Sequence, residues 1–83
     1  MKLLYFAWIR TKIGIAEEDV SPPAGVDDVA GLIAWLKGRG PRYEAALANE
    51  AVVKVAVNQE FAPPTHPVRP DDEVALFPPV TGG

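Results

Sequence analysis

The chain has 83 residues, a length typical of one small domain, and 48% of them are hydrophobic, which is enough for a core. A net charge of -3 without a basic patch argues against nucleic acid as a partner. The absence of cysteine excludes disulfides, zinc–thiolate sites and a cysteine nucleophile.

An apolar run at residues 3–9 opens the chain. It is too short to span a membrane and is not a signal peptide, so we expect a cytoplasmic protein without a membrane partner. Both alternating faces of the run are apolar, which predicts a central strand over all seven residues. One face must meet the core, and the other, which carries Phe6, is open to a partner outside the domain. Residues 10–14 then predict a turn or short helical connection that ends at Gly14.

The next segments predict an edge strand and the main helix. The acidic residues 15–21 favour a second strand, antiparallel to the first. Asp27 or Asp28 is suited to cap the following helix, because its carboxylate can accept hydrogen bonds from free backbone amides. One apolar stripe then repeats at i, i+3, i+4 and i+7, formed by Val29, Leu32, Ile33 and Leu36. Gly38 and Pro41 end the helix.

The second half of the chain predicts a short helix and three more strands. The helix is expected at residues 42–48, and a strand rich in β-branched residues at 52–57. Asn58 and Gln59 lie where a tight turn is expected, although the usual glycine is missing. A return strand starts at Phe61, and the last strand is expected at residues 74–77.

This order of elements predicts an α+β domain. One main helix among four or five short strands fits a mixed sheet that is covered by the helix on one face. The first and last strands are the most apolar, so we expect them to lie side by side in the centre. They would then be parallel, with the helix in the crossover. That arrangement is the ubiquitin-like β-grasp, here predicted over residues 1–77 with a short second helix.

The chain ends in a segment, residues 78–83, that we interpret as an extended tail. Pro78 and Pro79 favour a stiff, extended backbone, and Gly82 and Gly83 have no side chains. Such a tail can enter a narrow tunnel of a partner enzyme and present its carboxylate there. From Phe77 onward it could reach on the order of 20 Å, at ~3.3 Å per residue. The candidate reactive group is therefore the backbone carboxylate of the last glycine.

Three stretches of the chain resemble the sulfur-carrier small subunits of molybdopterin synthase, which are ubiquitin-like sulfur carriers. Residues 5–10, Tyr-Phe-Ala-Trp-Ile-Arg, followed by Gly14, are similar to the opening of that family. Residues 57–59, Val-Asn-Gln, match its turn in mid-chain. Residues 72–83 match its C-terminal signature at almost every position, whereas the proline-rich residues 62–65 depart from the family pattern.

The resemblance implies a defined chemistry at the tail. An adenylyltransferase similar to ubiquitin-activating enzymes would use ATP to join the Gly83 carboxylate to AMP, and a sulfur donor would then replace AMP to leave a thiocarboxylate. The tail would enter the large synthase subunit, in a heterotetramer, and donate sulfur to the pyranopterin precursor in molybdenum cofactor biosynthesis. By the same resemblance the chain binds no cofactor or metal and is no enzyme alone.

The family also implies which residues bind the partners. Three phenylalanines and the tail are carried over by position: Phe6, Phe61, Phe77, Pro78, Pro79, Val80 and Thr81, with Gly82 and Gly83 as the reactive end. Arg10 is added for its charge, as a cation suited to a salt bridge with a partner. From the residues alone, each phenylalanine is as well suited to the core as to an exposed docking site. Lys54 is a second cation suited to a salt bridge with a partner.

Other functions remain open on this sequence. The chain could carry sulfur for another pathway, such as thiazole or cysteine synthesis, or be a protein modifier joined to lysine. The opening segment and residues 77–81 favour the pterin pathway. A hypothesis of another class is a β-grasp binding module with an incidental diglycine. An independent enzyme is disfavoured, since no constellation of nucleophile, base and metal ligand appears.

Overall fold

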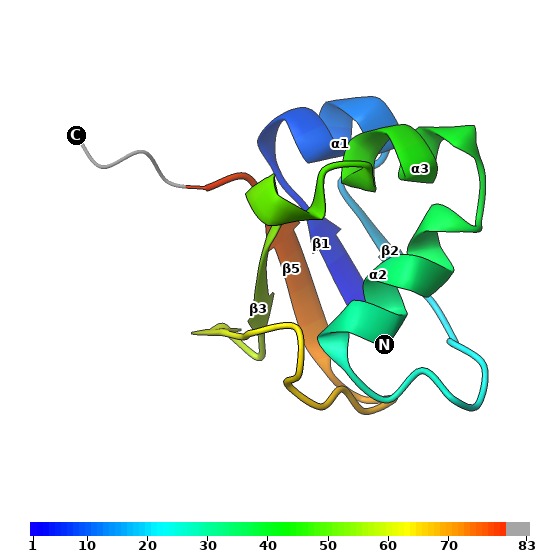
Figure 1. Cartoon of the computed structure of the whole chain (residues 1–83), viewed down its shortest axis with the longest axis vertical. Coiled ribbons are helices and arrows are strands. Elements are labelled where there is room, and N and C mark those ends of the chain that lie inside the picture. Colours follow the sequence, from blue (N-terminus) through cyan, green and yellow to red (C-terminus); the bar gives the residue numbers. More distant parts are fainter. Residues whose placement is uncertain (80–83) are drawn as a thin grey trace.

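In the computed structural model, which describes residues 1–79, helices cover one face of a five-stranded mixed sheet (Figure 1). The strands are β1 (Lys2–Tyr5), β2 (Glu17–Asp19), β3 (Lys54–Val57), β4 (Glu60–Phe61) and β5 (Glu73–Phe77). The helices are α1 (Ala7–Ile13), α2 (Val29–Lys37), α3 (Pro41–Leu47) and the 3-10 turn η1 (Glu50–Val52). Within the described residues, none of these helices has the length and apolar character that a bilayer crossing needs.

The strand order is β2-β1-β5-β3-β4. β1 and β5 are parallel neighbours, with Leu3 opposite Val74, and every other neighbouring pair is antiparallel. This topology confirms the predicted ubiquitin-like β-grasp and the predicted pairing of the first and last strands. β5 is the central strand, because two strands lie on each side of it.

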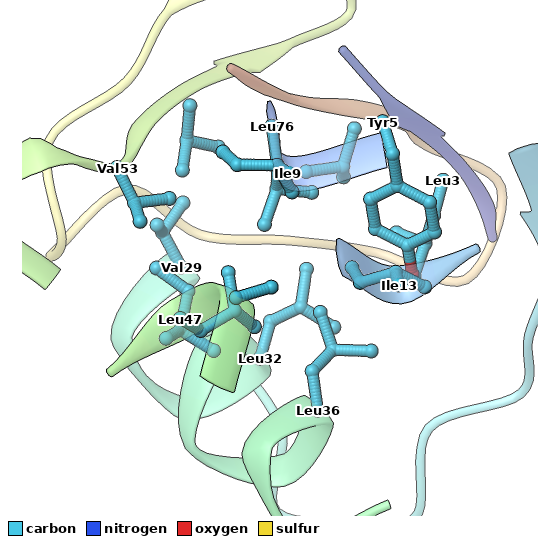
Figure 2. Close-up of a cluster of buried hydrophobic side chains, with 14 of the residues drawn as sticks. Leu3, Tyr5, Ile9, Ile13, Val29, Leu32, Leu36, Leu47, Val53 and Leu76 are labelled. Atoms are coloured by element: carbon cyan, nitrogen blue, oxygen red, sulfur yellow. The ribbon is translucent and has the colours of Figure 1, made fainter. Parts of the chain in front are cut away.

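The core lies between the sheet and the helices. Alternate side chains of the three inner strands point toward the helices and are at most 7% exposed: Leu3, Tyr5, Val55, Val57, Val74 and Leu76. The predicted stripe of α2 is confirmed, since Val29, Leu32, Ile33 and Leu36 are all buried against them. Figure 2 shows the leucines and valines of α2 and α3 facing Leu76 and Tyr5 across this layer. Such close packing of apolar side chains is the main source of stability in a domain of this size.

The first strand is shorter than predicted. β1 ends at Tyr5, and α1 begins at Ala7, so the expectation of a strand up to Ile9 was wrong. Ile9 and Ile13 are one helical turn apart and both are buried, which lets α1 close one end of the core. Ala7 has a φ of 52°, a left-handed conformation that turns the chain sharply from strand into helix. Gly14, with a φ of 97°, ends α1 as expected by a backbone bond to Arg10.

Other boundaries differ by a few residues. Asp28, the second of the two candidate caps, accepts a hydrogen bond from the Gly31 amide at 2.7 Å and starts α2. α3 begins at Pro41, one residue earlier than expected, because proline is well suited to the first helical position. β3 begins at Lys54 because the preceding residues form η1.

The predicted turn at Asn58 and Gln59 is confirmed. Both residues have positive φ, 51° and 71°, which matches the twist that a two-residue hairpin needs. The Asn58 side chain donates to Asp72 at 3.0 Å and accepts from the Glu73 amide at 3.0 Å. Burial opposes ionisation of Asp72, but the hydrogen bonds from Asn58 and the Arg69 amide outweigh it and lower its pKa. The hairpin is thus joined to the turn that leads into β5.

Candidate functional site

The face of the sheet opposite the helices carries an apolar row. Its members are paired in register across four strands: Leu4, Ala75, Ala56 and Phe61. Paired residues point to the same side of a sheet, so these side chains lie side by side. The first three are half-buried, and Phe61 is 79% exposed. No helix of residues 1–79 packs over this row.

The three predicted phenylalanines gather on this open face. Phe61 and Phe77 are in tilted ring contact, with centroids 5.8 Å apart. Phe6 has an extended backbone, and its amide donates to Leu76 at 3.1 Å, so it continues the β1–β5 pairing by one residue. Its side chain therefore points to the same side as Leu4, and it is 48% exposed. We call Phe6, Phe61 and Phe77 the aromatic face; its role in binding is still a prediction.

β5 leads the chain out of the sheet beside this aromatic face. Phe77 is the last residue of β5 and lies opposite Lys54 in the register of β3 and β5. Pro78 is half-buried and Pro79 is exposed. The predicted tail residues Val80, Thr81, Gly82 and Gly83 lie outside the described residues. The structure thus places the aromatic face at the exit of the strand that ends in the tail.

The two predicted cations lie next to the aromatic face. Arg10 is exposed on α1, one turn after Phe6, and its amide donates to the Phe6 carbonyl at 3.3 Å. Lys54 is exposed on β3, opposite Phe77. Within residues 1–79, neither side chain forms an ion pair. Both are therefore free to meet a carboxylate of a partner, which leaves the prediction for them standing.

The helix side of the sheet holds a polar cluster that sequence reasoning missed. The Glu18 carboxylate accepts hydrogen bonds from Tyr5 at 2.7 Å, Tyr43 at 2.7 Å and Arg39 at 2.9 Å. The Arg39 guanidinium also lies over the rings of Tyr43 and Trp35, at 4.9 Å and 5.2 Å. These contacts join β1 and β2 to the end of α2 and to α3, so we assign the cluster a structural role.

Electrostatics agree with that role. Burial opposes the charged form of Glu18, but the hydrogen bonds from Tyr5, Tyr43 and Arg39 outweigh it and hold the pKa of Glu18 below its ordinary value. Burial and the bond to Glu18 together raise the pKa of Tyr5. The acidic residues 15–21 were predicted to form an edge strand, and strand alternation turns the middle residue of β2 inward, opposite Leu3. That alternation was the signal available in the sequence.

Comparisons with known proteins cover the chain from end to end. The model of the ThiS family matches residues 3–83. The molybdopterin synthase sulfur carrier subunit of Escherichia coli (strain K12) is 36% identical over 83 residues, which are 100% of this chain and 99% of that protein.

Two solved structures are also similar. A putative molybdopterin converting factor, subunit 1, from Pyrococcus furiosus has a TM-score of 0.77 and 31% identity, covering 95% of each chain. SAMP1 (small archaeal modifier protein 1) from Haloferax volcanii has a TM-score of 0.74 and 27% identity, covering 100% of this chain and 98% of that one.

Proposed function

Because this chain belongs to the ThiS family, we propose that it is the sulfur-carrier subunit of a molybdopterin synthase, with the Gly83 carboxylate as the sulfur-bearing group. The observation that carries the proposal is the position of β5. This central strand runs into the tail directly beside three phenylalanines on an otherwise uncovered sheet face. A folded domain of this kind can bind a partner with that face and direct the tail into the partner's active site.

The chemistry follows from the state of a terminal carboxylate. With an ordinary pKa of about 3.3–3.7, it is ionised at neutral pH and resists attack by nucleophiles. When the carboxylate attacks the α-phosphorus of ATP, pyrophosphate leaves and an acyl adenylate forms. Sulfur at the oxidation level of sulfide then displaces AMP and leaves the thiocarboxylate. The difficult exchange of oxygen for sulfur is thus divided into two easier steps.

In this proposal the domain binds and orients, and its partners catalyse. An adenylyltransferase binds the ATP and activates Gly83, and the large synthase subunit provides the pocket in which sulfur passes to the pyranopterin precursor. The aromatic face is the docking surface for both partners, with Arg10 and Lys54 at its edges. Aromatic residues, phenylalanine included, are enriched in protein–protein interfaces relative to the rest of the protein surface. The exposure of Phe6 and Phe61 supports this assignment.

Intact mass spectrometry tests the function. After incubation with the adenylyltransferase, ATP and a sulfur donor, the chain is expected to gain about 16 Da, because sulfur replaces one oxygen in the exchange. A variant without Gly83 is the control, since it keeps the described domain and should show no gain. A chain that never gains this mass, or gains it equally without Gly83, contradicts the proposal.

A second candidate is a protein modifier, and the similarity to SAMP1 favours it. The two functions differ in the fate of the activated carboxylate. A modifier forms an amide bond with a lysine of another protein, whereas a sulfur carrier ends as a free thiocarboxylate. Conjugates that resist denaturation and reducing agents, formed with ATP and the adenylyltransferase, would support the modifier.

A further inference from the structure

A cavity of about 470 Å³ lies between α2 and the β3–β4 hairpin, adjacent to the aromatic face. Its lining is largely apolar and includes Val29, Ala30, Ile33, Val55, Phe61 and Pro64. This volume is within the range of about 300–1,000 Å³ that is usual for ligand pockets. We call it the α2–β3 cavity. Neither the motifs of the sequence nor the tail chemistry accounts for it.

Hydrogen bonds hold the walls of the α2–β3 cavity in place. The Ala30 amide donates to Pro64 at 2.9 Å, and the Val29 amide donates to His66 at 3.0 Å. The His66 amide in turn donates to Pro63 at 2.9 Å, which closes the turn of the proline-rich loop. These bonds fasten the loop to the first turn of α2. The cavity is therefore largely formed before binding, and an occupant has little ordering entropy to offset.

The charged residues of the cavity lining favour a carboxylate on the partner, next to the side chain that enters the cavity. Two charged residues belong to the lining, Glu50 and Lys54. Glu50 is paired with Lys37 at 3.4 Å, whereas Lys54 forms no ion pair within residues 1–79. Among the described residues, Lys54 is therefore the lining charge without an ion-pair partner, although the chain as a whole has a net charge of -3. Such a charge selects a carboxylate on the approaching surface.

The cavity is continuous with the proposed docking surface. Phe61 lines the cavity and also contacts Phe77 on the aromatic face. Lys54 lines the cavity and lies opposite Phe77, where β5 leaves the sheet. A protein that binds the aromatic face at Phe61 and Phe77 therefore also meets residues of the cavity lining.

We propose that the α2–β3 cavity receives an apolar side chain of the large synthase subunit, on a segment that places a carboxylate next to Lys54. This inference rests on the proposed function, since it takes the protein that receives the tail as the occupant. The cavity would act as a second anchor beside the aromatic face. It would fix the rotation of the carrier on its partner, which a flat aromatic face alone does not do.

Filling the cavity tests the proposal. Ala30 is exposed on the cavity wall, so Ala30→Phe fills the space without disturbing the core. Ala34→Phe is the matched control, because Ala34 is exposed on the same helix but does not line the cavity. Binding to the large subunit from the same organism is measured by calorimetry. We expect Ala30→Phe to weaken binding about tenfold or more, as for loss of a buried anchor, and Ala34→Phe to bind as the unmodified chain does.

Charge reversal gives a second, independent measurement. Lys54→Glu should weaken binding about tenfold at low salt and less at high salt, because salt screens the interaction with the partner's carboxylate. Lys12→Glu is the control of equal charge change. Lys12 is on α1, about 200° around the helix from Arg10 by helical geometry, and lies over the Trp8 ring.

The outcomes separate this inference from the proposed function. If the unmodified chain gains sulfur but Ala30→Phe binds the large subunit as well as Ala34→Phe does, the inference is wrong and the function stands. If the unmodified chain does not bind the large subunit, the inference is also wrong. If it gains no sulfur, the function itself fails. The two phenylalanine variants should unfold at the same temperature. A loss of thermal stability in Ala30→Phe alone would refute the placement of Ala30 on an open wall of the cavity.

Discussion

The two faces of the sheet differ in what their side chains do, although the same strands build both. On the helix side, residues such as Leu76 and Val74 are fully buried, and the carboxylate of Glu18 is held by three donors. On the open side, Phe6 and Phe61 remain in solvent. A chain this short has little apolar surface to spare, so apolar groups left exposed indicate binding. Substitutions on one face should therefore change stability, and on the other affinity.

The largest expected effect is on the core face. Leu76→Ala should lower the free energy of unfolding by about 2–5 kcal/mol, because it leaves a cavity in the centre of β5. Leu4→Ala, on the half-buried open face, should cost clearly less. Urea unfolding of the two variants measures the difference. Equal losses would show that the open face is packed as tightly as the core and would remove the contrast between the faces.

The next effect is on affinity. Phe77→Ala should weaken binding to the large synthase subunit by about 2 kcal/mol, roughly thirtyfold, because an aromatic anchor is lost. Its stability should fall by less than about 1 kcal/mol, since the ring is only half-buried. Calorimetric binding and thermal unfolding are measured on the same sample. Unchanged affinity with a large loss of stability would assign Phe77 to the core.

Glu18 tests whether the helix side tolerates a charge only while it is paired. The pKa of Glu18 is lowered in the folded chain. Its contribution to the free energy of unfolding is therefore complete above about pH 4.3, the ordinary pKa of glutamate. The contribution is lost as the pH falls through the lower folded value. Glu18→Gln should cost about 1–2 kcal/mol at pH 7, since charge-assisted hydrogen bonds are weakened.

The measurement for Glu18 is a pair of urea unfolding curves at each pH. The difference in stability between the unmodified chain and Glu18→Gln should shrink as the pH falls below about 4. Glu17→Gln, on the exposed side of β2, is the control and should change stability little. A difference that is constant with pH would mean that the pKa of Glu18 is the same in the folded and the unfolded chain, which contradicts the lowered folded pKa.

The smallest effect concerns the junction where the chain leaves β1. Ala7→Gly should raise stability by about 0.5 kcal/mol, because glycine relieves the left-handed φ of 52° but has more entropy to lose on folding. Ala45→Gly, in an ordinary exposed turn of α3, should lower it by about 1 kcal/mol. Thermal unfolding compares the two. Losses in both variants would show that the junction is unstrained.

Local patterns in the sequence predicted the parts of the fold that depend on neighbours along the chain. The stripe of α2, its cap at Asp28 and the tight turn at Asn58 follow from spacing and residue type. The start of α1 did not, because a short apolar run has no period that separates strand from helix. The left-handed Ala7 has no compositional signal either.

The candidate site divides in the same way. The aromatic face was predicted from the resemblance to a family, since alternation alone left each phenylalanine as well suited to the core. The Glu18 cluster and the α2–β3 cavity depend on contacts between distant segments. Glu18 meets Arg39 and Tyr43 on other elements, and the cavity needs the proline-rich loop to dock on α2. No local pattern in the sequence predicts such contacts between distant segments.

The central position of β5 has a consequence for how the chain is made. Within residues 1–79, β1 and β2 form one hairpin-like unit, β3 and β4 form another, and β5 is the strand that joins them. Lys2 pairs with Glu73, so the sheet closes only after β5 has been synthesised. A shortened chain leaves β1 and β3 without their common neighbour. β5 both completes the sheet and leads into the tail. A chain can therefore direct its tail from this position only after the sheet has folded.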